Sequence, residues 1–220
     1  MVPLAPDRAI APEQMDHAPE DVARASLRDL TRINRYFGGH RVLRSVFAGL
    51  VKPQEGFSVL DVGAASGDLG AALRRMYPNV TVTSLDHRSL HLAQAAPPKL
   101  VADAFRLPFR PRSFDFVFSS LFLHHFPNDD VVELLTSFRC VARRAVLAID
   151  LDRGPLAYHF LPATRWLFRW HAVTVSDGQI SVQAGFKREE LQALAVRAGL
   201  GWARVKPHRP WARLSLVAPF

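Results

Sequence analysis

The chain has 220 residues, 49% of them hydrophobic, which is enough to bury one substantial core without a second domain. Its formal net charge of +8 would suit nucleic-acid binding, but the arginines are spread along the whole chain and no RNA- or DNA-binding motif is present. The single cysteine, Cys140, excludes an internal disulfide framework and fits the apolar pattern of a buried helix position. No apolar run reaches the roughly 20 residues of a membrane span and the first residues lack the order of a signal peptide, so we expect a cytoplasmic protein.

Two features are expected before the core of the chain. Residues 1–20 are rich in proline, alanine and charged residues, which predicts a flexible arm. The apolar positions that follow predict two helices, over 21–34 and 40–50, separated by a pair of glycines. Together these helices indicate a helical lid over residues 21–56.

The stretch 59–68, Val-Leu-Asp-Val-Gly-Ala-Ala-Ser-Gly-Asp, joins an apolar strand to a turn of small residues. Such a turn lets a ligand reach the main-chain N–H groups at the start of the next helix. A nicotinamide fingerprint needs glycine at its first, third and sixth positions, which here are Gly63, Ala65 and Asp68. Two of the three fail, and Asp61 before the turn repels phosphate and attracts a cation. The sequence therefore favours a smaller ligand that contains adenosine.

Acidic residues follow the next two predicted strands. Asp86 ends the strand expected over 80–86 and lies 19 positions after Gly67, close to the offset of roughly 20 residues at which a carboxylate meets ribose hydroxyls. The alternative for Asp86 is a cap on a following helix that begins near Arg88. Asp103 comes after a further short strand, and it is either a second ligand-binding acid or a turn residue.

Residues 113–126 join a continuous apolar run, typical of a central strand buried on both faces, to two adjacent histidines. In open α/β sheets, ligands bind at the carboxyl edge where these histidines fall. Neighbouring residues on a helix point about 100° apart, so both cannot face a substrate equally. We predict that His124 faces the active site and that His125 packs behind it. A hydrogen-bonded core histidine is the alternative for either.

Strands and helices alternate between residues 57 and 150, which predicts a parallel sheet with helices on both faces. Strands are expected over 57–62, 80–86, 99–102, 114–120 and 144–150, and helices over 67–76, 88–96 and 128–142. An aromatic-rich insertion over 151–186 comes next. The last part, 187–220, predicts a helix and two closing strands, over 187–198, 201–206 and 211–218.

The four stretches described above resemble class I S-adenosylmethionine-dependent methyltransferases, in the branch that methylates quinones, polyketides and other small molecules. The first motif of that family reads Gly-x-Gly-x-Gly, and this chain has Gly-x-Ala-x-Gly. The resemblance is strong over residues 57–150 and rests on topology alone for the tail. It implies an α/β fold with a doubly wound, Rossmann-like sheet of seven strands whose last strand is antiparallel. Helices on both faces and an amino-terminal helical lid complete a single methyltransferase domain over 21–220.

The resemblance also implies the cofactor, S-adenosyl-L-methionine, which leaves as S-adenosyl-L-homocysteine. In the family, the aspartate of the third motif, here Asp103, accepts a hydrogen bond from the adenine amino group. The cofactor-binding residues expected from these motifs are Asp61, Gly63, Ala64, Ala65, Gly67, Asp86, His87, Asp103, Ala104 and Ser119. The expected catalytic residues are His124 and His125, with His124 the first candidate for a general base or for orienting the acceptor.

We expect no metal at the site. His87 and His91 have the spacing of two ligands on one helix face, but no third ligand follows in a recognised pattern. The metal-dependent branch of the family carries acidic residues after its fourth strand, where this chain has Ser119-Ser120-Leu121.

Large apolar side chains in the insertion and the lid bear on the acceptor. Phe160 and Trp166 in the insertion, with Tyr36 and Phe37 in the lid, favour a flat or apolar molecule. We therefore expect O- or C-methylation of a small aromatic, quinone or polyketide-like metabolite. The alternatives are methylation of RNA or protein, which the positive charge favours, and a cofactor-binding protein without transfer activity, which Ala65 would explain.

Overall fold

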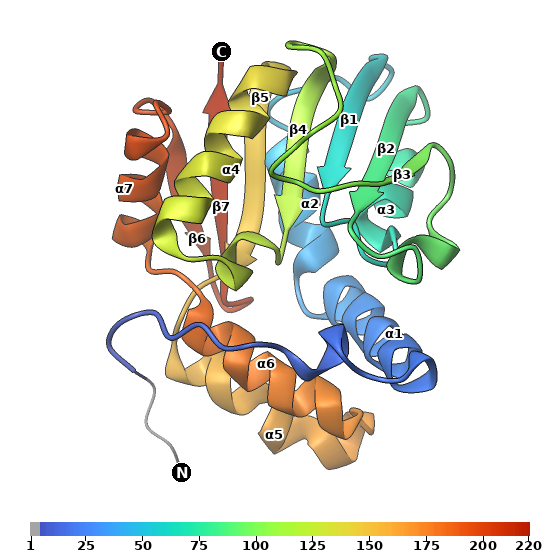
Figure 1. Cartoon of the computed structure of the whole chain (residues 1–220), viewed down its shortest axis with the longest axis vertical. Coiled ribbons are helices and arrows are strands. Elements are labelled where there is room, and N and C mark those ends of the chain that lie inside the picture. Colours follow the sequence, from blue (N-terminus) through green and yellow to red (C-terminus); the bar gives the residue numbers. More distant parts are fainter. Residues whose placement is uncertain (1–4) are drawn as a thin grey trace.

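The computed structural model describes residues 5–220, and within that range its centre is a sheet of seven strands in the order β3-β2-β1-β4-β5-β7-β6 (Figure 1). The strands are β1 (Phe57–Val62), β2 (Val80–Asp86), β3 (Lys99–Val101), β4 (Phe114–Ser120), β5 (Ala142–Leu151), β6 (Arg204–His208) and β7 (Arg213–Pro219). β7 is antiparallel to both of its neighbours, whereas β1 to β5 pair in parallel. The predicted doubly wound sheet with an antiparallel last strand is confirmed.

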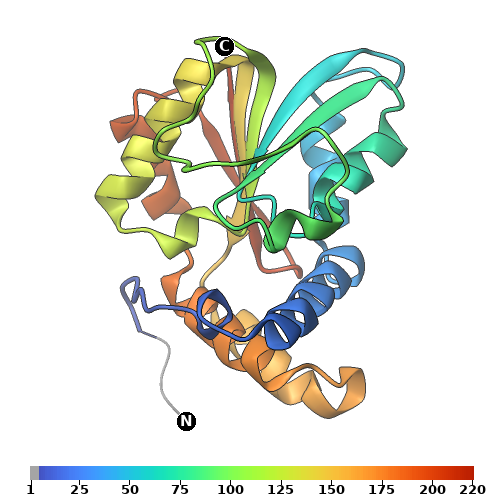
Figure 2. The ribbon, with the colours of Figure 1, turned by 45° about the vertical axis from the view of Figure 1, so that its right-hand side comes forward.

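Helices cover both faces of the sheet, α2 and α3 on one face and α4 and α7 on the other (Figure 2). In that order, their bounds are Gly39–Phe47, Asp68–Met76, Asn128–Val141 and Arg188–Arg197. Successive strand residues point to opposite faces, so Val59 packs with α2 and α3 while Leu60 packs with α4 and α7. This burial on both faces explains the continuous apolar runs of the central strands.

Three further helices form a lid beyond the carboxyl ends of the parallel strands, at the bottom of Figure 1. They are α1 (Glu20–Tyr36), α5 (Pro155–Phe168) and α6 (Ala172–Ala184). The insertion, for which the sequence analysis specified no helices, thus forms α5 and α6. Its aromatic rings meet those of the amino-terminal lid, with the ring centres of Phe37 and Phe160 4.8 Å apart. None of the helices within residues 5–220 has the length and apolar character that a bilayer crossing needs.

An arm, residues 5–19, extends along α6 and across the lid (Figures 1 and 2). The Arg8 guanidinium stacks 4.0 Å above the Phe186 ring centre and donates a hydrogen bond to the Phe126 carbonyl at 3.0 Å. The prediction of a flexible arm missed these contacts, which no pattern in the arm itself announces. Residues 1–4 lie outside the described part of the chain.

Two local predictions are wrong. The helix expected over 88–96 is reduced to a short 3-10 turn, η2 (His91–Gln94), because the proline pair beginning at Pro97 disfavours helical backbone before it. Cys140, expected in the core, is exposed. It lies on α4 beside the buried Val141 but outside the apolar stripe that faces the sheet.

Candidate active site

A cavity of about 940 Å³ lies between the carboxyl ends of the strands and the lid. The turn after β1 and the end of β2 line one side of it, including Gly63, Ala65 and Asp86. Apolar lid side chains such as Phe37 and Phe160 line the other side. The volume is near the upper end of the range for small-molecule sites, which leaves room for a cofactor and an acceptor together.

The turn after β1 requires its small residues. Gly63, Ala65 and Gly67 have φ values of +70°, +46° and +69°, in the left-handed region. A Cβ at Gly63 would come within 2.3 Å of the Phe122 ring, and one at Gly67 within 2.7 Å of the Ala95 Cβ. Ala65 therefore holds a conformation that costs an L-residue about 1–2 kcal/mol.

Asp86, the last residue of β2, is hydrogen-bonded to this turn. One carboxylate oxygen accepts from the Ala65 N–H at 3.0 Å, and the other accepts from the Arg88 N–H at 3.1 Å and lies 3.1 Å from His91 Nδ1. Burial raises the pKa of Asp86, but the hydrogen bonds from His91 and from the backbone outweigh it and hold the pKa below its ordinary value. Asp86 therefore faces the cavity as a carboxylate whose position is fixed.

The other expected cofactor residues divide into two groups. His87, Asp103 and Ala104 line the cavity together with Gly63, Ala65 and Asp86. The residues that do not line it are Asp61, Ala64, Gly67 and Ser119.

Asp61 contradicts the expectation of a charged group that attracts a cation. It is 2% exposed, and burial, followed by the charges of Asp68 and Asp86, raises its pKa to about 8. The group is therefore mostly neutral at pH 7. At the end of β4, Ser120 lines the cavity in place of Ser119, because neighbouring strand residues point to opposite faces.

Asp150, near the end of β5, positions the histidine segment η3 (Leu123–His125). One of its oxygens accepts from the Leu123 N–H at 2.9 Å, and the other lies 2.6 Å from His124 Nδ1. The sequence analysis did not select Asp150. The signal was present, because Asp150 falls at the same carboxyl edge as Asp86 and the histidines.

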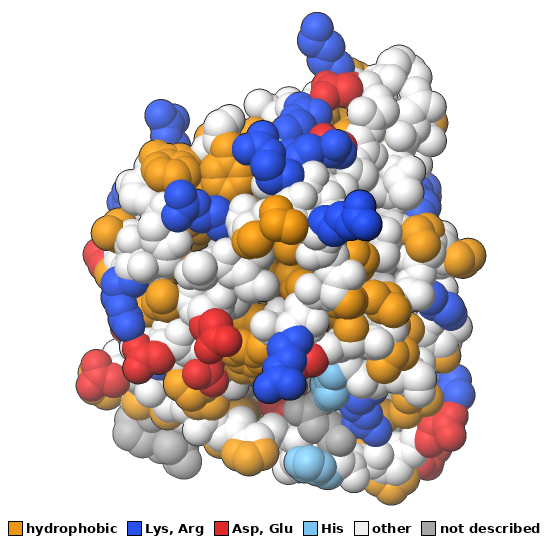
Figure 3. Space-filling model, turned by 45° about the horizontal axis from the view of Figure 1, so that its top comes forward, with side chains coloured by type: hydrophobic (Ala, Val, Ile, Leu, Met, Phe, Trp, Pro, Cys, Tyr) orange, Lys and Arg blue, Asp and Glu red, His pale blue; other side chains and the backbone are white. Residues whose placement is uncertain are grey.

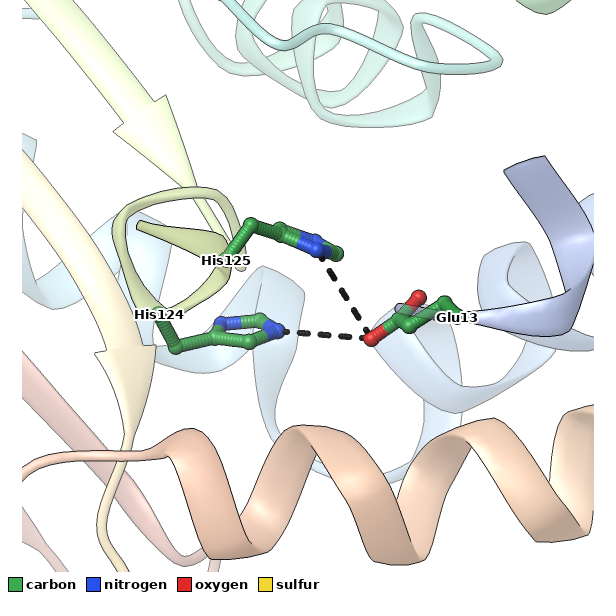
Figure 4. A group of neighbouring side chains, drawn as sticks. All are labelled: Glu13, His124 and His125. Carbon is green, nitrogen blue, oxygen red and sulfur yellow. Dashed lines mark ion pairs between the residues drawn. The ribbon is translucent and has the colours of Figure 1, made fainter. Parts of the chain in front are cut away.

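Both histidines point toward Glu13, which the arm places at the cavity wall (Figure 4). Glu13 Oε1 lies 3.8 Å from His124 Nε2 and 3.8 Å from His125 Nδ1. The two rings are stacked, with centres 4.3 Å apart. The predicted arrangement, with His125 behind His124, is wrong: both line the cavity, and His125 is the more exposed side chain, at 31% against 3%. The turn η3 is only three residues long, so the helical angle between neighbours does not apply.

The charges of this cluster are settled by burial and pairing. Burial lowers the pKa of His124, but the carboxylates of Asp150 and Glu13 outweigh it and raise that pKa to about 9. The same contacts hold the pKa values of Asp150 and Glu13 below their ordinary range despite burial. At neutral pH His124 is thus an imidazolium between two carboxylates, and it has no free lone pair with which to act as a base.

Arg213, at the start of β7, adds a second buried cation to the cavity wall. Burial lowers its pKa to about 10, opposed by the charge of Asp150. Its Nε has no hydrogen-bond partner within residues 5–220.

Residues 60–152 match the family model described as a methyltransferase domain. This range contains the turn after β1, Asp86, Asp103 and the two histidines. This part of the chain is a class I S-adenosylmethionine-dependent methyltransferase domain. The match confirms the resemblance in the motifs. No curated protein matches the methyltransferase in sequence.

Solved structures share the fold of the methyltransferase. An S-adenosylmethionine-dependent methyltransferase from Aquifex aeolicus superposes with a TM-score of 0.60 at 17% identity, over 88% of this chain and 96% of that one. Magnesium protoporphyrin IX methyltransferase from Synechocystis, with bound S-adenosylhomocysteine, gives 0.57 at 17% identity over 83% of each chain. A plantazolicin methyltransferase, bound to a triazolic desmethyl analogue and S-adenosylhomocysteine, gives 0.70 at 12% identity over 93% and 92%. At these identities, the likeness concerns the fold.

Proposed function

We propose that this methyltransferase transfers a methyl group to an oxygen or carbon nucleophile of a small aromatic, quinone or polyketide-like molecule. The observation that carries the proposal is that one cavity is lined both by the turn at Gly63 and Ala65 and by the apolar lid at Phe37 and Phe160. A cofactor on the first side and a flat acceptor on the second would meet inside the cavity.

The cofactor side follows from the hydrogen-bonding groups at the carboxyl edge. Asp86 keeps unused acceptor capacity on its oxygens and would take the ribose hydroxyls. Asp103 would face the adenine, and its Oδ1 accepts from the Phe105 N–H at 2.9 Å, which fixes the carboxylate. His87 and Ala104 complete this wall.

The acceptor side is apolar, with charged groups at one end. Phe37, Phe160 and Leu161 offer flat and branched apolar surface, which suits an aromatic ring. Arg213 supplies positive charge, which stabilises an oxyanion such as a phenolate or enolate, whereas the His124 imidazolium is already paired with two carboxylates. An amine acceptor, cationic before it loses a proton, would gain nothing from this cation.

S-adenosylmethionine supplies an electrophilic methyl group on a sulfonium cation. The main task of the chain is to align the nucleophile and exclude water, since alignment contributes up to about 7–11 kcal/mol and a general base about 10²–10⁴-fold. On transfer the cofactor would leave as S-adenosylhomocysteine, and the acceptor proton would go to a base. We assign that base to His125, which is half-buried at the cavity wall, and assign His124 to holding Glu13 and the arm in place.

One group of basic side chains lies away from this cavity. Figure 3 shows Lys and Arg side chains gathered near the top of the visible face, toward the amino ends of the parallel strands, with others scattered lower down. The cavity lies at the opposite, carboxyl ends. This arrangement favours a small acceptor over RNA or protein.

The proposal is tested by incubating the purified chain with methyl-labelled S-adenosylmethionine and three acceptor sets: phenols and quinols with β-diketones, total RNA, and unfolded protein. We expect label only in the small-molecule set, with one S-adenosylhomocysteine formed for each methyl transferred. Label confined to RNA or protein would overturn the acceptor class. Cofactor binding without transfer to any set would indicate a binding protein instead.

A further inference from the structure

We propose that Glu13, His124 and His125 form a binding site for one divalent transition-metal ion at the acceptor end of the cavity. The three side chains come from two places far apart in sequence, the arm and the turn after β4, and they point toward one another (Figure 4). Two imidazole nitrogens and one carboxylate oxygen are ligands that suit zinc, and also iron or manganese.

The distances leave room for an ion. The ligand atoms all lie within 4.8 Å of one another, and Glu13 Oε1 is 3.8 Å from each histidine nitrogen. These separations exceed a direct hydrogen bond, and they define a point about 2.2–2.5 Å from all three atoms, against about 2.0–2.2 Å for zinc with nitrogen and oxygen ligands. The two rings are stacked with 28° between their planes, so completing the site requires a small contraction and a turn of the more exposed His125 ring that points its Nδ1 lone pair at the ion.

The surroundings of His124 are those of a metal-bound histidine. Its Nδ1 lies 2.6 Å from Asp150 Oδ1, so the ring is held with Nε2 directed at Glu13. Histidines that bind metals usually donate their second ring N–H to a carboxylate in this way, which fixes the ring and strengthens the ligand. The ion would lie between His124 Nε2 and Glu13 Oε1, and Nε2 must be free of a proton to bind it.

A second group in the chain is a less suitable site. Asp86, His87 and His91 also bring their ligand atoms together. The Asp86 oxygen nearest both rings already accepts from the Arg88 N–H, and His91 Nδ1 lies at ordinary hydrogen-bond distance from it. This second group supplies a matched control, because His87 is an exposed side chain.

The remaining coordination positions of the ion face the cavity, since all three ligands line it. In the metal-bound protein His125 is a ligand and no longer a free base, so an acceptor hydroxyl or enol would bind the ion as its anion and release its proton to solvent. This role in acceptor binding rests on the proposed function, whereas metal binding itself is measured without any acceptor.

The test uses the full-length chain, stripped with a chelator and titrated calorimetrically with Zn²⁺ and Mn²⁺ at pH 7. We expect one Zn²⁺ per chain, at least tenfold weaker binding in both Glu13→Gln and His125→Ala, and unchanged binding in His87→Ala. Asp150→Asn should weaken binding about 10- to 100-fold through His124. Absorption of bound Co²⁺ in the visible range gives a second readout of nitrogen and oxygen ligation.

The proposal is overturned if wild type binds no Zn²⁺ at millimolar concentration, if Glu13→Gln binds as wild type does, or if His87→Ala abolishes binding. Far-UV circular dichroism of the same samples shows whether each variant is folded. Labelled methyl transfer by the wild type, measured separately, distinguishes a failure of the metal site from a failure of the proposed function.

Discussion

Replacement of Ala65 by glycine tests the conformation of the cofactor turn. Ala65 has φ +46°, and relief of that strain is worth about 1–2 kcal/mol. Glycine also lowers the free energy of unfolding by about 0.4–1 kcal/mol, because it adds conformational freedom to the unfolded chain. The hydrogen bond to Asp86 comes from the backbone N–H and survives the change. Ala65→Gly should therefore raise the free energy of unfolding by about 0.5–1 kcal/mol.

The assay is urea unfolding, with the midpoint compared at constant slope, and calorimetric titration with S-adenosylmethionine. Ala64→Gly is the matched control, because Ala64 is buried and lacks a positive φ, so this change should cost about 0.5–1 kcal/mol. Cofactor affinity of Ala65→Gly should equal or exceed that of wild type. Equal destabilisation by the two changes would show that the Ala65 methyl group fits a packed site and that the strain argument is wrong.

Assayed in EDTA so that no metal contributes, His125→Ala should lower turnover about 10²- to 10⁴-fold with little change in cofactor Kd, since proton transfer to the base is lost. Arg213→Met should raise the acceptor KM about 10- to 100-fold in steady-state kinetics, because it removes a hydrogen bond from a charged donor. Asp86→Ala should weaken cofactor binding by about 1.5–3 kcal/mol in calorimetry. The folded pKa of His124, about 9, lies above its ordinary 6.5, so its contribution to stability is complete below pH 6.5 and is lost as pH rises through 9. Urea unfolding in the presence of EDTA should show that the free energy of unfolding falls by about 3 kcal/mol as the pH rises from 6.5 to above 9.

Each of these expectations has an outcome that contradicts it. His159 does not line the cavity, so turnover reduced equally in His159→Ala and His125→Ala would remove the base role. An unchanged acceptor KM in Arg213→Met would show that the guanidinium only neutralises the charge of Asp150 and does not bind the acceptor. A cofactor Kd unaffected by Asp86→Ala would remove that residue from the site. A pH-dependent loss that persists in His124→Asn would have to come from another group.

The sequence determined the fold through short-range patterns. Largely apolar runs set β1 and β4, because these strands are buried on both faces, and the alternation of Val and Thr set β2. The starts of the helices that follow β1 and β4, at the carboxyl edge of the sheet, were predicted from turn residues and spacing. The segment before Pro97 escaped this reasoning, since its apolar content suggested a helix that the following prolines oppose.

The candidate site was only partly predictable. The positions of Gly63, Asp86 and the histidines follow from one rule, that ligands bind at the carboxyl ends of parallel strands. The roles of these residues do not follow from that rule, because the pKa of His124 depends on two distant residues. Asp150 comes 26 positions after His124, and Glu13 comes more than 100 positions before it. The arm that brings Glu13 to His125 has no strong pattern of its own. Tertiary packing alone decided that contact, since the charge and hydrogen bonding of a buried group depend on neighbours that the chain brings together only when folded.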